Sequence, residues 1–153
     1  NGKLSGADGS MSAVEALLNA ASVYMETPDD IEALSEAVDK ISRDAMESSD
    51  TSEAARKLYQ QLLQDTGTDL AVNYYDTGYK AYRSGDYETA IENLTKAVSY
   101  DETNSEALYA LANSYRDNGN KRQAKETYQK VIELFPNTEK ATQSQRALDQ
   151  LDN

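Results

Sequence analysis

The chain has 153 residues, with 27 acidic and 15 basic side chains, a formal net charge of −12, and neither Cys nor His. A chain this acidic has no basic face for the phosphates of nucleic acid or for anionic lipid, so neither is expected as a partner. Without Cys and His the usual ligands of zinc, haem and iron–sulfur centres are missing, and we expect no metal site and no cofactor.

The N-terminal part of the chain is predicted to be helical after a short linker. Residues 1–11 are rich in Gly and Ser and are interpreted as a flexible linker. Apolar residues then recur at helical spacing over residues 12–26, 31–45 and 50–63. Gly67 follows the third of these helices and suits the left-handed residue that lies just past a helix end. These features define residues 12–69 as an N-terminal helical segment.

Two interpretations of this N-terminal segment stay open. Ala55, Tyr59 and Leu62 have the spacing of the second helix of a helical repeat. On that interpretation, Ile31–Asp65 is a degenerate repeat capped by the helix before it. The alternative is a helical hairpin of no repeat class, which only shields the first true repeat.

The rest of the chain is predicted to consist of paired helices joined by tight turns. Within each pair the two helices are joined by a short turn, at Gly85-Asp86 in the first pair and at Gly119-Asn120 in the second. The predicted helices cover residues 70–84, 87–100, 105–118, 121–134 and 138–151. With the three upstream segments this makes an all-α chain of about eight helices.

The C-terminal half repeats itself with a period of 34 residues. When residues 71–104 are laid over residues 105–138, small and aromatic positions coincide. The matched pairs are Gly78 with Ala112, Gly85 with Gly119, Ala90 with Ala124, and Leu94 with Tyr128. Small residues allow two helices to cross closely, and large residues fill the space beside the crossing. A fixed period with this pattern predicts helix–turn–helix units that stack into a solenoid.

These positions resemble the tetratricopeptide repeat family, whose motif places Leu-Gly, Tyr, a small turn, Ala, an aromatic residue, Ala and Pro at fixed spacing. The first repeat departs from the motif at Ala81, where the family has Tyr, and at Glu102, where it has Pro. The resemblance implies two repeats over residues 70–138 in a helix-turn-helix superhelix. Residues 139–153 then form a C-terminal capping helix with a polar outer face, where we expect the array to end.

The resemblance also implies which residues face the concave groove of such a superhelix. In the family the first helix of each repeat lines this groove, chiefly at its second, fifth, ninth and twelfth positions. The corresponding residues are Val72, Tyr75, Tyr79 and Tyr82 in the first repeat and Glu106, Tyr109, Asn113 and Arg116 in the second. We select all of these except Glu106 as the candidate peptide-binding groove. Tyr74, Tyr115 and Tyr128 occupy core positions instead.

The function expected from these residues is non-catalytic binding of a peptide or protein segment in the Tyr-rich groove. Tyr is a good recognition residue because it is rigid and combines a large apolar ring with a hydroxyl. No catalytic residues are assigned, since no nucleophile–base pair stands out. Tyr75 and Tyr79 occupy positions where one subclass of the family uses Lys and Asn to bind a C-terminal carboxylate, so that carboxylate clamp is absent.

Another function class stays open beside binding in the groove. The chain would then be a structural or self-assembly domain of a membrane-anchored bacterial envelope protein, with a homodimer formed through the face Ile31–Ala45 or through the edge of the solenoid. Two placements follow from the sequence. One is extracytoplasmic, with an anchor that precedes Asn1 and the Gly/Ser-rich residues as a spacer; the other is cytoplasmic. In neither case is direct membrane contact expected from this segment.

Overall fold

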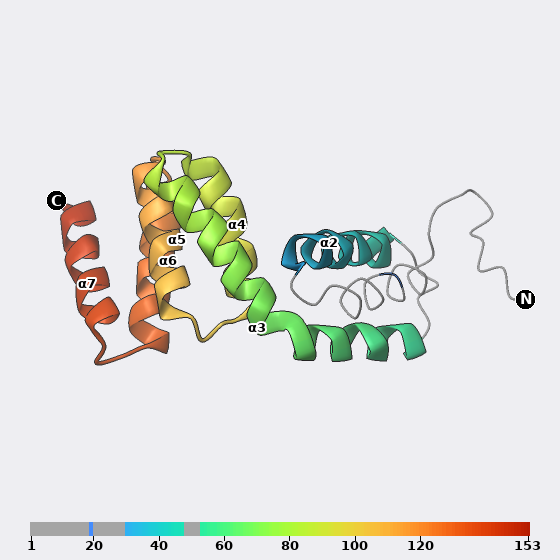
Figure 1. Cartoon of the computed structure of the whole chain (residues 1–153). Coiled ribbons are helices and arrows are strands. Elements are labelled where there is room, and N and C mark those ends of the chain that lie inside the picture. Colours follow the sequence, from blue (N-terminus) through green and yellow to red (C-terminus); the bar gives the residue numbers. More distant parts are fainter. Residues whose placement is uncertain (1–18, 20–29, 48–52) are drawn as a thin grey trace, which may run out of the picture. The chain divides into compact units, whose positions relative to one another are not determined.

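The computed structural model describes residue 19, residues 30–47 and residues 53–153 (Figure 1). In these ranges the chain is helical with connecting turns and contains no strand, as the composition and periodicity predict. The chain divides into two compact units, Asn1–Leu70 and Ala71–Asn153, each of which is described by itself. No helix in the described ranges is long and apolar enough to cross a membrane.

Fewer helices are described than the sequence predicts. The described ranges contain six, labelled α2 to α7, instead of about eight. One difference corrects the prediction. The two helices predicted over residues 50–63 and 70–84 form a single helix. The other concerns the predicted linker and first helix, residues 1–26, which lie outside the described residues apart from a helical Asn19.

The first unit contains helix α2, Ile31–Glu47. Asp30 lies just before this helix, and its Oδ1 accepts a hydrogen bond from the Ala33 N–H at 3.0 Å. This satisfies one of the backbone donors that a helix start leaves without an intrahelical partner. Leu34, Val38 and Ile41 recur at helical spacing and are 0 to 1% exposed. Three central residues of the face Ile31–Ala45 are therefore buried within the chain.

Helix α3 runs without a break from Glu53 to Arg83, so the predicted helix end at Gly67 is wrong. Gly inside a helix costs about 1 kcal/mol relative to Ala, which is too little to end a helix whose neighbouring residues are buried. Thr66 and Leu70, on either side of Gly67, are both fully buried. The Thr66 hydroxyl donates to the Leu62 carbonyl at 2.6 Å, within the helical turn that precedes Gly67.

The second unit contains the C-terminal part of α3 and four further helices. These are α4 (Tyr87–Tyr100), α5 (Ser105–Asp117), α6 (Lys121–Leu134) and α7 (Glu139–Asp152). Their bounds differ from the predicted ones by at most one residue. Neighbouring helices along the chain pack against each other, α4 on α5, α5 on α6 and α6 on α7 (Figure 1).

Two equivalent turns join the helices within each pair. Gly85 and Gly119 have φ values of 84° and 86°, which Gly adopts without the steric penalty that a Cβ brings. The Asp86 N–H donates to the Ala81 carbonyl at 2.9 Å, and the Asn120 N–H donates to the Tyr115 carbonyl at 2.8 Å. Both turns thus have the hydrogen bonding of a Schellman motif, which ends a helix and redirects the chain. The period of 34 residues is therefore present in the backbone as well as in the side chains.

Side chains of the connecting segments specify where the following helices begin. Asp86 accepts from the Thr89 N–H at 3.2 Å, Asn104 from the Ala107 N–H at 3.0 Å and Thr138 from the Ala141 N–H at 3.2 Å. Each of these bonds satisfies a donor in the first turn of α4, α5 or α7. Removing such a cap costs about 1 kcal/mol, so the helix starts are locally encoded.

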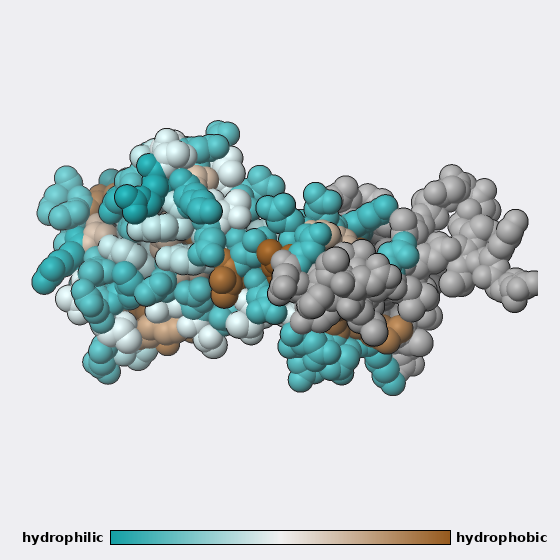
Figure 2. All heavy atoms as spheres, viewed as in Figure 1, coloured by the Kyte–Doolittle hydropathy of each residue, from teal (hydrophilic) through white to brown (hydrophobic). Residues whose placement is uncertain are grey.

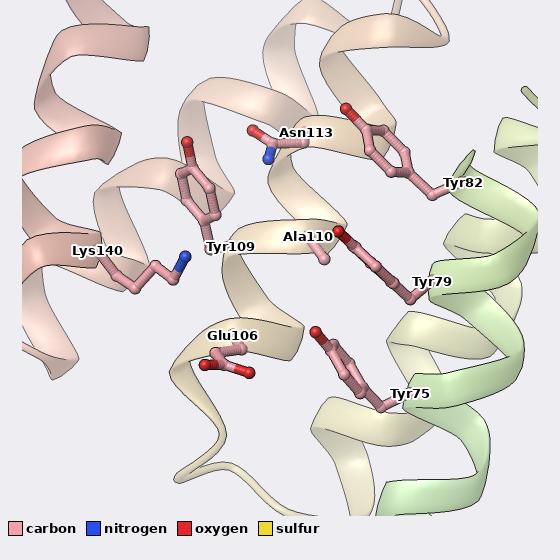
Figure 3. A pocket seen from close by; sticks show the side chains of 8 residues that line it. All are labelled: Tyr75, Tyr79, Tyr82, Glu106, Tyr109, Ala110, Asn113 and Lys140. Carbon is pink, nitrogen blue, oxygen red and sulfur yellow. The ribbon is translucent and has the colours of Figure 1, made fainter.

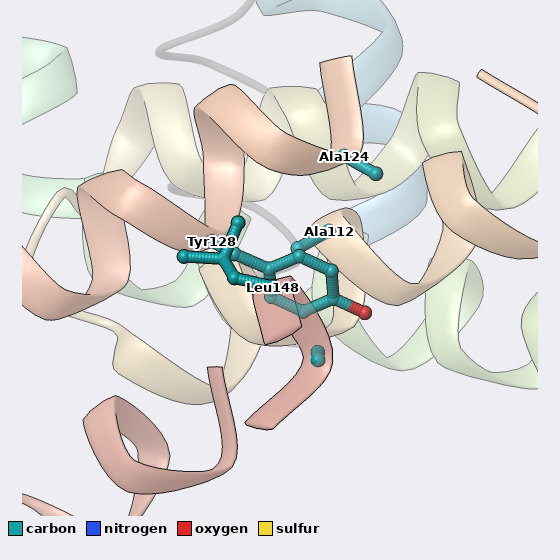
Figure 4. Close-up of a cluster of buried hydrophobic side chains, with 5 residues drawn as sticks. Ala112, Ala124, Tyr128 and Leu148 are labelled. Carbon is teal, nitrogen blue, oxygen red and sulfur yellow. The ribbon is translucent and has the colours of Figure 1, made fainter. Parts of the chain in front are cut away.

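The core of the second unit alternates small and large residues, as the repeat pattern predicts. Ala112, Ala124, Tyr128 and Leu148 belong to one buried cluster between α5, α6 and α7 (Figure 4). Tyr128 is completely buried and Tyr74 is 6% exposed, which agrees with their core positions. Tyr115 is partly buried and packs against this cluster.

The face of the described residues that Figure 2 shows is mostly hydrophilic, with teal and white residues and only small brown patches. The exposed large apolar side chains are Leu58, Val72, Tyr79 and Leu134. The outer side of α7 carries Thr142, Gln145, Arg146 and Asp149, all exposed, and this polar face suits a terminal helix of a solenoid.

Helices α3 and α4 approach each other closely at Gly78. A Cβ built on Gly78 would lie 2.8 Å from Leu94 Cγ and 3.1 Å from the Leu94 backbone N. We predict that Gly78→Ala lowers the free energy of unfolding, because an overpacking cost of about 1–3 kcal/mol exceeds the gain in helix propensity of about 1 kcal/mol. Urea denaturation measures the change. In a Leu94→Ala background the same substitution should cost less, because the contact with Leu94 Cγ is lost while the contact with the backbone N remains. An equal cost in both backgrounds would show that the Leu94 side chain is not the cause.

Two buried serines should respond to alanine in opposite directions. Ser144 Oγ is buried and has no hydrogen-bond partner in the part of the chain that the structure describes, whereas Ser114 Oγ donates to the Ala110 carbonyl at 2.8 Å. Leaving a buried polar group unsatisfied costs about 1–3 kcal/mol, so Ser144→Ala should raise the free energy of unfolding. Ser114→Ala should leave it unchanged or lower it. Denaturation midpoints of the two variants provide the comparison, and a loss of stability in Ser144→Ala contradicts the prediction.

Candidate functional site

The second unit contains a pocket between helices α3, α5 and α7 (Figure 3). Its volume is about 300 Å³, which is at the small end of the range for ligand pockets. Side chains of all three helices enclose it. The lining residues are Tyr75, Tyr79, Tyr82, Glu106, Tyr109, Ala110, Asn113 and Lys140.

The structure brings five of the seven residues selected from the sequence to this one pocket: Tyr75, Tyr79, Tyr82, Tyr109 and Asn113. The other two are elsewhere. Val72 is 51% exposed and does not line the pocket. Arg116 is not in the lining either, and its Nε donates to Asp117 Oδ1 at 2.7 Å. Both residues have the spacing of groove positions. In the structure, however, Val72 is exposed outside the pocket and Arg116 is paired with Asp117.

Three tyrosines of α3 form one wall of the pocket. Tyr75, Tyr79 and Tyr82 share a helix face because they are four and three residues apart. Their rings are stacked, with centroids 5.8 Å apart for the first pair and 6.3 Å for the second. In Figure 3 the hydroxyl groups of these rings point across the pocket towards α5. This wall therefore presents a row of phenol groups whose rings hold one another in place.

A buried residue of α6 orients the opposite wall. The Tyr128 hydroxyl donates to Asn113 Oδ1 at 2.5 Å, and the Tyr128 ring lies 6.0 Å from the Tyr109 ring. The Asn113 oxygen is thereby engaged, which leaves the amide NH₂ as a donor at the pocket. Burial raises the pKa of the Tyr128 phenol, and this phenol stays protonated as the donor. The sequence shows Tyr128 as a core residue, and its hydrogen bond to the site is visible only in the structure.

Lys140 is a lining residue that sequence reasoning missed. The sequence places it in the capping helix. Lys140 also follows Glu106 by 34 residues, so the repeat period could have identified it as a residue of the groove. The Lys140 ammonium lies over the Tyr109 ring, 4.7 Å from its centroid, and donates to Gln143 Oε1 at 3.4 Å. Glu106 and Ala110 of α5 also line the pocket outside the selected set.

The end of the tyrosine row is connected to an ion pair. The Tyr82 hydroxyl donates to Asp117 Oδ2 at 2.7 Å, and Asp117 is also paired with Arg116. Burial, together with the hydrogen bond to the Asp117 carboxylate, raises the pKa of Tyr82 to about 12. The hydrogen bond from Arg116 lowers the pKa of Asp117 from its usual value. Tyr82 is thus fixed in orientation, whereas no hydrogen bond of the Tyr75 or Tyr79 hydroxyl is found among the described residues.

Comparison with known proteins finds similarity in the C-terminal part of the chain. Residues 81–148 match the sequence model of the family described as tetratricopeptide repeat. Two similar curated proteins are both named photosystem I assembly protein Ycf3. The protein from a Synechococcus species is 40% identical over 67 residues, covering 42% of this chain and 39% of that protein. The protein from Prochlorococcus marinus is 36% identical over 66 residues, covering 41% and 38%. The chain thus matches about two fifths of the length of these relatives.

Two solved structures are also similar to the chain. MamA has a TM-score of 0.48 and 23% sequence identity, covering 91% of this chain and 81% of MamA. The C-terminal TPR-containing domain of an FK506-binding protein from Plasmodium falciparum has a TM-score of 0.47 and 16% identity, covering 93% of this chain and 87% of that domain.

The pairing of Asp117 makes a pH-dependent contribution to stability that Asp117→Asn should remove. A carboxyl whose folded pKa is depressed stabilises the protein above its unfolded pKa, and this contribution is lost as the pH falls through the folded pKa. We expect a loss of about 0.5–1 kcal/mol at pH 7, discounted for the partial exposure of the pair. The difference from the unsubstituted protein should shrink below about pH 4. Urea denaturation at pH 7 and pH 3 measures it.

The control for this prediction is Arg116→Gln, which removes the first cause of the depressed pKa. In that background Asp117→Asn should show a smaller pH-dependent difference. The interpretation is wrong if Asp117→Asn has the same effect on unfolding at both pH values.

Proposed function

We propose that this chain, whose residues 81–148 match the tetratricopeptide repeat family, is a non-catalytic interaction module that binds a peptide or protein segment in the tyrosine pocket of α3, α5 and α7. The proposal depends on one observation. Four tyrosines and Asn113, which come from two successive repeats, converge on a single pocket of about 300 Å³.

The chemistry of this pocket suits a peptide. The Tyr75 and Tyr79 hydroxyls and the Asn113 amide can form hydrogen bonds with backbone groups, while the rings cover apolar side chains. Stacking of the rings limits their rotation before any partner arrives. A preorganised wall loses little conformational entropy on binding, and this favours affinity.

The lining residues do not favour catalysis. The titratable groups other than tyrosine that line the pocket are Glu106 and Lys140. Neither stands beside a Ser or Thr in the lining that it could activate, and the chain contains no Cys or His. The arrangement supports binding better than bond making or breaking.

The names of the curated relatives suggest what such binding is for. Both relatives are named photosystem I assembly proteins, and the shared segment is the repeat region. A domain that holds segments of other proteins is suited to bringing subunits together, and we extend this general role in assembly to the present chain. Its partner is then a protein or peptide.

Self-assembly as a structural domain of a bacterial envelope protein is the second candidate, but a specific observation weighs against the dimer surface first considered for it. Leu34, Val38 and Ile41 of α2 are buried within the chain. A homodimer through this face would require it to be exposed first. The tyrosine pocket, in contrast, is available without any rearrangement.

A peptide selected from a random linear display library provides the test. We predict that Tyr79→Ala raises the Kd of such a peptide about 5- to 30-fold, as expected for a central aromatic contact. Fluorescence anisotropy measures the Kd. Tyr79 is 39% exposed, so its removal should change the free energy of unfolding by less than about 1 kcal/mol.

Leu134→Ala is the matched control, since Leu134 is 58% exposed on α6 and does not line the pocket. It should leave the Kd unchanged. If Tyr79→Ala instead keeps the Kd and lowers stability by several kcal/mol, the ring is a packing residue and the proposed site is wrong.

A further inference from the structure

Glu106 lines the pocket with a carboxylate that takes part in no described contact between helices. It lies in the first turn of α5 and is exposed. A carboxylate there interacts favourably with the helix dipole, but Asn104 already caps this helix through its bond from the Ala107 N–H. Among the described residues no ion pair or hydrogen bond to the Glu106 side chain is found. The carboxylate is therefore available to a ligand.

The negative charge of Glu106 acts on the nearest part of the tyrosine row. The pKa of Tyr75 is raised, first by burial and next by the charge of Glu106. In Figure 3 the Tyr75 hydroxyl faces Glu106 across the pocket, with the Tyr79 hydroxyl above it. Phenolic oxygens and a carboxylate thus border the same end of the pocket. Oxygen atoms with a negative charge among them form a site for a cation that carries hydrogen-bond donors.

One positive charge also lines the pocket. Lys140 is held over the Tyr109 ring and by Gln143. Its distance from the Tyr109 ring is typical of cation–π attraction. In Figure 3 the Glu106 carboxylate lies between the Lys140 ammonium and the Tyr75 hydroxyl. A basic group of a ligand therefore binds on the tyrosine side of Glu106, because Lys140 repels it from the other side.

We propose that the segment bound in this pocket carries a basic side chain, best an arginine, whose guanidinium is held by the Glu106 carboxylate and the Tyr75 and Tyr79 hydroxyl oxygens. This inference rests on the proposed function and specifies its ligand. Arg suits the site better than Lys, since its planar fork of five N–H donors can bind a carboxylate through two bonds and still reach a phenol oxygen. The same plane can lie against a tyrosine ring.

The test starts from peptides that bind the unsubstituted protein, selected from a random display library. We expect a recurrent Arg or Lys in these peptides. Replacing that residue by citrulline, which keeps the shape but removes the charge, should weaken binding about tenfold, as Glu106→Gln should in the protein. Combined, the two changes should weaken binding little more than either alone, because both remove the same interaction.

Three further variants separate a local effect from a change of net charge. Selection on Glu106→Lys should favour acidic residues at the same peptide position. Selection on Glu133→Lys, which makes the same charge change at an exposed position of α6 outside the pocket, should still favour basic residues. Lys140→Gln should tighten binding of a basic peptide, since it removes a like charge from the pocket.

The outcomes distinguish this inference from the proposed function. If citrulline leaves the Kd unchanged while Tyr79→Ala weakens binding, the pocket binds peptides but not through a basic side chain, and the inference is overturned alone. If the selected peptides bind Tyr79→Ala as tightly as the unsubstituted protein, or if none is enriched over that variant, the pocket is not the binding site and both fail.

Discussion

The close approach of α3 and α4 at Gly78 is the constraint on which the second unit depends. With no side chain at this position, the fully buried Leu94 of α4 packs against the backbone of α3. This contact fixes how α3 is rotated about its axis. Tyr75 and Tyr82 lie three residues before and four residues after Gly78, and both pack against the cluster that contains Leu94, so their direction towards α5 follows from that rotation. A backbone contact in the core thus positions the wall of the site.

The second repeat uses the same arrangement with one chemical difference. Its close-packed cluster contains Ala112 and Ala124, but the large residue that corresponds to Leu94 is Tyr128. The ring fills the core as a leucine would, and the hydroxyl extends far enough to bind Asn113. One residue therefore serves both packing and the orientation of a pocket amide. Core and site are consequently linked in this repeat, whereas in the first repeat the large residue is purely apolar.

Two charged side chains line the pocket besides the tyrosines. The chain as a whole is strongly acidic, yet the pocket has both a carboxylate, Glu106 on α5, and an ammonium, Lys140 on α7. Complementary charges contribute more to specificity and to the rate of association than to affinity. In the proposed function the stacked rings therefore provide most of the contact area, and Glu106 and Lys140 select the ligand and its orientation.

Local interactions explain what the sequence by itself determined. The paired helices of residues 70–138, their turns at Gly85 and Gly119, and the shared face of Tyr75, Tyr79 and Tyr82 follow from helical spacing and from glycine conformation, which involve residues near one another in the chain. Only the tertiary structure decided that α3 continues through Gly67, that Lys140 enters the pocket while Val72 does not, and that Tyr128 binds Asn113. These features depend on burial and on contacts between separate helices, and a local pattern does not contain their geometry.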